Sequence, residues 1–72
     1  MPKKNIRFRF GERVRKLRRQ KGRSQRVLAK QAGISRSYLQ KIEGNNPPGV
    51  TVDTIAKIAR GFEISASQLL KF

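Results

Sequence analysis

Residues 25–44, QRVLAKQAGISRSYLQKIEG, decide the fold that this sequence predicts. The stretch reads as two short helices joined by a tight turn. Ser24 and Ser35 precede the two helices, and the side-chain oxygen of such a residue accepts a hydrogen bond from an unpaired N–H group of the first turn. Gly33 lies between the helices and can take the left-handed backbone conformation that ends a helix. The pattern predicts a helix, a short elbow and a second helix.

The apolar residues of this stretch recur at helical spacing and predict an inward face. That face consists of Leu28, Ala29, Ala32, Ile34, Leu39 and Ile42. The second helix then turns outward Arg36, Ser37, Gln40 and Lys41. A small-residue elbow before a helix with a polar, cationic outer face is the pattern of a helix-turn-helix that reads DNA.

Length and composition narrow the function classes. A chain of 72 residues forms one domain with a small core. There is no Cys or His and there are only four acidic residues, so most metal sites and acid–base constellations lack their side chains. We therefore expect neither an enzyme nor a cofactor. No apolar run reaches the length of a membrane span or a signal-peptide core, which favours a cytoplasmic, nucleoid-associated protein.

The charge is extreme and uneven. The net charge is +14, and residues 1–36 carry 14 of the 18 Lys and Arg residues with Glu12 as their only acid. One-sided basic charge of this size indicates a polyanionic partner. Nucleic acid is the leading expectation, with a membrane surface or an acidic protein as the alternatives.

Around the central stretch we expect a basic N-terminal arm over 1–9 and an all-α domain over 10–72. The cations of the arm are Lys3, Lys4, Arg7 and Arg9. They either follow the DNA backbone or a minor groove, or belong to a disordered tail. Ile6 and Phe8 alternate with Arg7 and Arg9, which also suits a short strand or a partner contact.

Apolar periodicity and caps predict five helices around one core. Three cover 11–21, 25–32 and 36–43, a fourth is capped by Thr51 and ends near Gly61, and a last one covers 66–71. The fourth helix presents the stripe Val52, Ile55, Ala56, Ala59 and Phe62, and in the last helix Leu69 and Leu70 pack back onto the core. The two prolines within 45–49 exclude a helix there.

Residues 10–70 resemble the Cro/phage-repressor-type helix-turn-helix domain, also called the XRE family. The matching elements are GERVRKLR over 11–18, SQ at 24–25 followed by LA at 28–29, GIS at 33–35, YL at 38–39, IEG at 42–44, IA at 58–59, IS at 64–65, and Leu69. The resemblance implies a compact five-helix lambda-repressor-like domain.

The resemblance also implies which residues contact DNA. In the family, the helix that follows Ser35 lies in the major groove, so that Arg36, Ser37, Gln40 and Lys41 would face base edges. Arg and Lys donate to guanine O6 and N7, and Gln pairs with adenine N6 and N7. The alternative is that these four side chains are only solvated.

Contacts to the DNA backbone are implied for Gln25, Arg26, Tyr38, Asn45, Asn46 and Thr51. Gln25 would touch a phosphate and brace Arg36. Tyr38 would reach a phosphate or a thymine methyl, or would pack its ring against the loop. Exposed helix N-termini bind phosphates through their free N–H groups, which suits these positions.

Within the scaffold, the resemblance pairs Glu43 with Arg18. Three departures from the family pattern affect other positions. Arg23 stands where the family usually has Leu or Met before Ser24. Glu63 stands where a left-handed Gly commonly ends the fourth helix. The loop over 45–50 is about one residue longer than the commonest form in the family. We expect the turn at Glu63 to differ from the family's, and the longer loop weakens the argument for phosphate contacts within it.

The leading functional hypothesis is a sequence-specific, double-stranded-DNA-binding transcriptional regulator, either minimal or part of a longer protein. It would act as a homodimer on a pseudo-palindromic operator, with recognition helices roughly 34 Å apart. The dimer would form through the C-terminal helix, with Leu69, Leu70 and Phe72. The alternatives are an antitoxin-like or coactivator-like protein-interaction module, and a non-specific nucleic-acid-binding protein.

Overall fold

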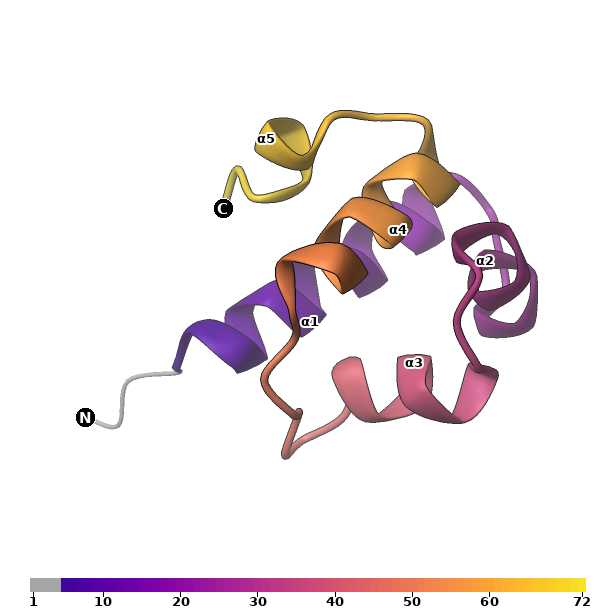
Figure 1. The fold of residues 1–72 in the computed structure, drawn as a ribbon. Helices are drawn as coiled ribbons and strands as arrows, with labels where there is room; N and C mark the ends of the chain where they lie inside the picture. Colours follow the sequence, from indigo (N-terminus) through magenta and orange to yellow (C-terminus); the bar gives the residue numbers. More distant parts are fainter. Residues whose placement is uncertain (1–4) are drawn as a thin grey trace.

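Five helices and no strand make up residues 5–72, the part of the chain that the structure, a computed structural model, describes (Figure 1). The helices are α1 (Ile6–Gln20), α2 (Gln25–Ala32), α3 (Arg36–Ile42), α4 (Val52–Phe62) and α5 (Ala66–Leu69). Figure 1 shows α4 in front of α1, with α2 beside one end of the pair, α3 below it and α5 above it. The predicted all-α fold is confirmed. None of these helices is long and apolar enough to cross a bilayer.

Side-chain caps define where the helices begin. The four predicted caps each accept a hydrogen bond from the N–H group three residues on: Ser24, Ser35, Thr51 and Ser65. These oxygens satisfy N–H groups that have no partner within the helix. The last cap is reciprocal, because the Gln68 side chain also accepts from the Ser65 N–H at 3.0 Å. Local chemistry therefore sets the N-termini of four helices.

The first helix begins five residues earlier than predicted. The Asn5 side chain caps it by accepting from the Phe8 N–H at 3.0 Å, so Ile6 and Phe8 lie in a helical turn and the short strand considered for them is wrong. Ile6 is 64% exposed, so this turn carries no buried stripe from which periodicity could detect it. Arg7 and Arg9 are therefore helical, whereas Lys3 and Lys4 lie outside the described residues.

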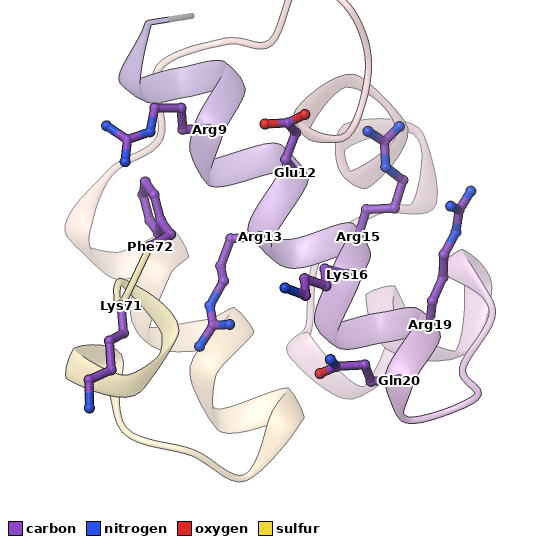
Figure 2. A pocket seen from close by; sticks show the side chains of 9 residues that line it. All are labelled: Arg9, Glu12, Arg13, Arg15, Lys16, Arg19, Gln20, Lys71 and Phe72. Carbon is purple, nitrogen blue, oxygen red and sulfur yellow. The ribbon is translucent and has the colours of Figure 1, made fainter.

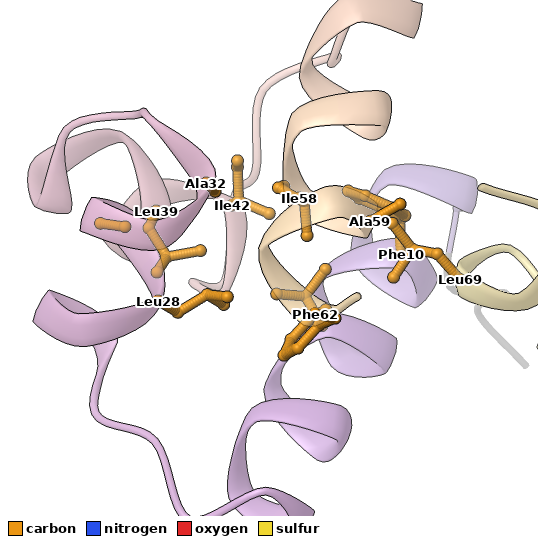
Figure 3. Close-up of a cluster of buried hydrophobic side chains, with 11 residues drawn as sticks. Phe10, Leu28, Ala32, Leu39, Ile42, Ile58, Ala59, Phe62 and Leu69 are labelled. Atoms are coloured by element: carbon orange, nitrogen blue, oxygen red, sulfur yellow. The ribbon is translucent and has the colours of Figure 1, made fainter. Parts of the chain in front are cut away.

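The core forms where α2 packs against α4, and Phe10 and Val14 of α1 and Leu69 of α5 join it (Figure 3). The predicted stripe of α4 is partly wrong, because Val52 is 80% exposed and Ala56 is also exposed. Ile58 takes their place and is fully buried with Ala59 and Phe62. Val52 is the first residue of α4 and lies beyond the edge of the core, so helical spacing alone does not bury it.

Glycine allows the closest contact between α2 and α4. A Cβ atom added at Gly61 would lie 3.1 Å from the Ala32 nitrogen and 3.2 Å from its Cβ atom. Gly near the end of a helix lowers helix stability by about 1 kcal/mol relative to Ala. Here it lets two backbones approach, which explains a residue that helix propensity disfavours.

Arg23 fills the place of the missing apolar residue by bonding to the end of α4. Its Nη1 donates to the Gly61 carbonyl oxygen at 2.6 Å, and its guanidinium carbon lies 5.9 Å from the centre of the Phe62 ring. A cation over an aromatic face is attracted by the ring quadrupole. The side chain thus joins the loop before α2 to the C-terminus of α4.

The turn after α4 keeps the left-handed conformation although no glycine is present. Glu63 has φ 61°, and the Ile64 N–H donates to the Ala59 carbonyl at 3.0 Å. The expectation that this turn differs in geometry is wrong, since Glu63 adopts the backbone that Gly favours at a cost of about 1–2 kcal/mol.

Helix α5 is shorter than predicted and buries only one of its two leucines. Leu69 is fully buried, whereas Leu70 is 44% exposed and does not pack back as predicted. The helix ends at Leu69, so the chain leaves the core before Leu70 could face it. Leu69 consequently cannot contribute to a dimer surface, which corrects its place in that predicted set.

Helix α1 crosses the end of α3 at Gly11. A Cβ atom added there would meet the backbone carbonyl oxygen of Ile42, the last residue of α3, and would lie 3.1 Å from its carbonyl carbon. Gly11 is buried, and the atoms it faces are backbone rather than the mobile end of a side chain. A side chain at this position would therefore push α3 away from α1.

We predict that Gly11→Ala destabilises the protein. Overpacking typically costs about 1–3 kcal/mol, and more when backbone must shift. This outweighs the gain of about 1 kcal/mol from replacing Gly by Ala in a helix. The measurement is the free energy of unfolding from urea titration, with Lys16→Ala at an exposed position of α1 as the control. A Gly11→Ala variant more stable than the parent would contradict the close approach of α1 to α3.

Candidate nucleic-acid interface

Helix α3 has one buried and one exposed face. The Ser35 hydroxyl accepts from the Tyr38 N–H at 3.0 Å, while Leu39 and Ile42 anchor the helix in the core. The opposite face consists of the exposed residues Arg36, Ser37, Gln40 and Lys41. The prediction that these four side chains face solvent is confirmed, and their contact with bases stays a prediction.

Tyr38 is only partly exposed. Its ring packs against the hydrophobic core. Of the three alternatives for this residue, a packing role is supported by this contact with the core, and packing against the loop stays a prediction. A contact of its hydroxyl with a phosphate stays a prediction.

A buried ion pair fixes the end of α3 against α1. The Arg18 Nε and Nη2 atoms donate to the two carboxylate oxygens of Glu43, each at 2.9 Å. The side chains are 13% and 3% exposed. The third nitrogen of Arg18 donates to the Arg23 carbonyl at 2.9 Å. The pair that the resemblance implied is present, and a bidentate guanidinium–carboxylate contact fixes orientation as well as distance.

Gln25 joins this cluster at the start of α2. Its Nε2 donates to Glu43 Oε1 at 3.2 Å, so the hydrogen bond that the Gln25 side chain makes in the structure is to the ion pair rather than to Arg36. The bracing of Arg36 and the phosphate contact of Gln25 stay predictions. Arg26, the next residue, is exposed.

The segment between α3 and α4 exposes Asn45 and Asn46 and ends at the cap of α4. The Thr51 hydroxyl donates to the Thr54 hydroxyl and accepts from the Thr54 N–H, both at 3.1 Å. Pro47 is buried and holds the loop against the domain. The amides are therefore available for a DNA backbone, and their contact with one stays a prediction.

Gly49 provides a surface for Arg7, a contact that no sequence signal indicates. A Cβ atom added at Gly49 would lie 3.1–3.2 Å from three atoms of the Arg7 guanidinium. The cation on the first turn of α1 thus lies against the loop that follows α3. Sequence reasoning missed this contact because 42 residues separate the two positions, and neither has a distinctive motif.

Two hollows flank α1. One, of about 540 Å³, is mostly apolar and includes Ile6, Leu70 and Phe72 in its lining. The other, of about 610 Å³, lies between the opposite flank of α1 and the C-terminus and is strongly cationic (Figure 2). The Phe72 ring lines both, with its centre 6.4 Å from that of Phe10 and 5.4 Å from the Arg9 guanidinium carbon.

Comparison with protein families and curated proteins gives a consistent result. A family described as "Helix-turn-helix domain" matches residues 11–71. The HTH-type transcriptional regulator SinR of Bacillus subtilis is 33% identical over 61 residues, which cover 85% of this chain and 55% of SinR. The chain therefore spans about half the length of the curated relatives it matches.

Solved structures of similar fold cover nearly whole chains. The restriction-modification controller protein C.AhdI from Aeromonas hydrophila has a TM-score of 0.81 and 36% identity, covering 88% of this chain and 94% of its own. The controller C.Esp1396I, solved bound to a 19 base pair DNA duplex, has a TM-score of 0.84 and 25% identity, covering 94% and 89%.

We predict that Glu43→Ala destabilises the fold by about 3–5 kcal/mol, because it strands the largely buried Arg18 charge. The check is the free energy of unfolding by chemical denaturation. Asp53→Asn, which neutralises an exposed carboxylate in the first turn of α4, is the control and costs no more than about 1 kcal/mol. Equal losses for the two variants would mean that the ion pair has no special structural role.

Proposed function

This chain belongs to the helix-turn-helix domain family of the Cro/phage-repressor (XRE) type, and on that premise we propose that it is a sequence-specific, double-stranded-DNA-binding transcriptional regulator. The observation that carries the proposal is the exposed face of α3, in which four polar or cationic side chains project from a helix anchored by Leu39 and Ile42. A similar domain solved with a DNA duplex supports it. The proposed role is binding and regulation, not catalysis.

The base-reading role falls to the outer face of α3. A recognition helix contacts bases mainly through its N-terminal residues. We assign Arg36 and Ser37 to that position and Gln40 and Lys41 to the next turn. Arg36 provides the most specific chemistry, since its guanidinium can donate two hydrogen bonds to one guanine.

The backbone contacts that we propose surround this helix on two sides. Gln25, Arg26 and Tyr38 lie on the helix-turn-helix itself, and Asn45, Asn46 and Thr51 lie in the following segment. We add Arg7 from the proposed basic arm, because its contact with Gly49 places a cation beside that segment. These contacts would set position and affinity rather than sequence choice.

We propose that a homodimer forms at the apolar hollow beside α5. Ile6, Leu70 and Phe72 are large apolar residues that remain exposed, and all three line this hollow. Exposed apolar patches of this kind mark association surfaces. Two-fold pairing would place two α3 helices on one face of a duplex, which suits a pseudo-palindromic site.

Selection of bound sites from random duplexes tests the proposed function. A specific regulator retains a preference of about 10³-fold or more for its selected site over random DNA at physiological salt. Binding without any preferred sequence would instead identify a non-specific nucleic-acid-binding protein.

On the selected site, we predict that Arg36→Ala weakens binding by about 1–3 kcal/mol and relaxes the preference at one base pair of each half-site. The measurement is a titration of the selected duplex and of its single-base variants. Lys57→Ala, at an exposed position of α4, is the control and leaves the affinity and the base preference unchanged. An equal loss on every duplex would place Arg36 on a phosphate instead.

We predict that Ile6→Glu combined with Leu70→Glu shifts the protein towards monomer, because each copy would bury two carboxylates in an apolar contact. Sedimentation equilibrium measures the dimer dissociation constant. The control is Val27→Glu, which charges an exposed apolar residue of α2 outside the hollow. If the double variant dimerises like the parent, the interface lies elsewhere.

A further inference from the structure

The cationic hollow beside α1 has a composition that the proposed DNA contacts do not require. Its lining includes Glu12 as the single carboxylate and six cations, Arg9, Arg13, Arg15, Lys16, Arg19 and Lys71. Figure 2 shows these side chains along the exposed flank of α1 and on the C-terminal segment. Arg9 and Arg13, like Arg15 and Arg19, stand four residues apart on α1 and are therefore neighbours on its surface, where like charges repel one another. An anionic partner would relieve that repulsion.

Three of the six cations already have a structural role. The Arg13 guanidinium donates to the Gln68 carbonyl at 2.8 Å and to the Leu69 carbonyl at 3.2 Å, which ties α1 to α5. Arg9 lies over the Phe72 ring, and Arg15 Nη1 is 3.5 Å from the Glu43 carbonyl oxygen. The partners in these contacts are backbone oxygens and an aromatic ring. None of these contacts pairs a guanidinium charge with a carboxylate.

The other three cations are exposed and have no partner among the described residues. Within residues 5–72, Lys16, Arg19 and Lys71 have no ion pair and no side-chain hydrogen bond. They belong to α1 and to the C-terminal segment, and they line one hollow only because the fold brings these two parts of the chain together. Apart from Arg9, the hollow shares no residue with the surface proposed for DNA.

We propose that this hollow binds an acidic polypeptide segment of a partner protein. Carboxylates pair with guanidinium groups through two parallel hydrogen bonds, and with Lys through a point charge. A hollow of about 610 Å³ has room for a short peptide segment, and apart from Arg9 its residues lie outside the surface proposed for duplex DNA. The partner would thus bind on a flank of α1 while α3 remains free for DNA.

Single-stranded nucleic acid fits the hollow less well. Proteins that bind single strands combine cations with several aromatic rings on which bases stack. Phe72 is the one ring in this lining, and it already packs against Phe10 and Arg9. The chemistry of the site is therefore cationic rather than stacking, which favours carboxylate side chains.

The test uses the full chain and a fluorescently labelled peptide of Glu and Asp residues, with binding followed by anisotropy at physiological salt. The variant Lys16→Gln, Arg19→Gln, Lys71→Gln should lower peptide affinity about tenfold, which corresponds to roughly 0.5 kcal/mol for each exposed charge. The matched control Lys30→Gln, Lys57→Gln, Arg60→Gln removes the same charge from exposed positions outside the hollow and should change affinity less than about twofold.

The same two variants are titrated with a random-sequence duplex and a single-stranded oligonucleotide. The proposal is supported if the hollow variant loses peptide affinity selectively and keeps nucleic-acid affinity within about threefold. An equal loss of peptide affinity in both variants would overturn it, because binding would then follow net charge alone. A larger loss for either nucleic acid than for the peptide would also overturn it and assign the hollow to nucleic acid.

Discussion

The ion pair between Arg18 and Glu43 is the interaction on which the rest of the structure depends. It joins α1 to the end of α3, Arg18 also holds the Arg23 carbonyl before α2, and Gln25 donates to Glu43 from the first turn of α2. Removing two charges from water offsets much of their attraction, so such a pair contributes more to geometry than to net stability. Its consequence here is a fixed orientation of α3 relative to the two helices behind it.

The same constraint leaves the outer face of α3 exposed and apart from the cations of α1. The ion pair at its C-terminal end and the buried residues Leu39 and Ile42 hold α3 in place, so the side chains of its outer face are not needed to anchor the helix. Seven of the 18 Lys and Arg residues lie on α1, outside the proposed reading helix, where they would supply long-range attraction rather than base discrimination. Phe72, at the boundary of the two hollows, lies between an apolar and a cationic surface.

Local signals predicted a large part of the fold. Ser24, Ser35 and Thr51 each accept a hydrogen bond from an N–H group three residues on, so a short stretch of sequence is enough to predict where these helices begin. Periodicity failed at the edges of the domain, where burial depends on what lies opposite. Val52 has the correct spacing but is 80% exposed, and Ile6 begins a helix whose first turn has no fully buried residue.

The sequence by itself determined the helix-turn-helix and the outward position of Arg36, Ser37, Gln40 and Lys41, and it predicts the sign of the partner's charge, because these follow from spacing, capping and composition. Only the tertiary structure decided that Gly11 must lack a side chain, that Arg7 lies against Gly49, and that cations of α1 and Lys71 line one hollow. Each of these joins residues distant in the chain. Contacts of that kind depend on how the helices cross, and no local pattern records the crossing.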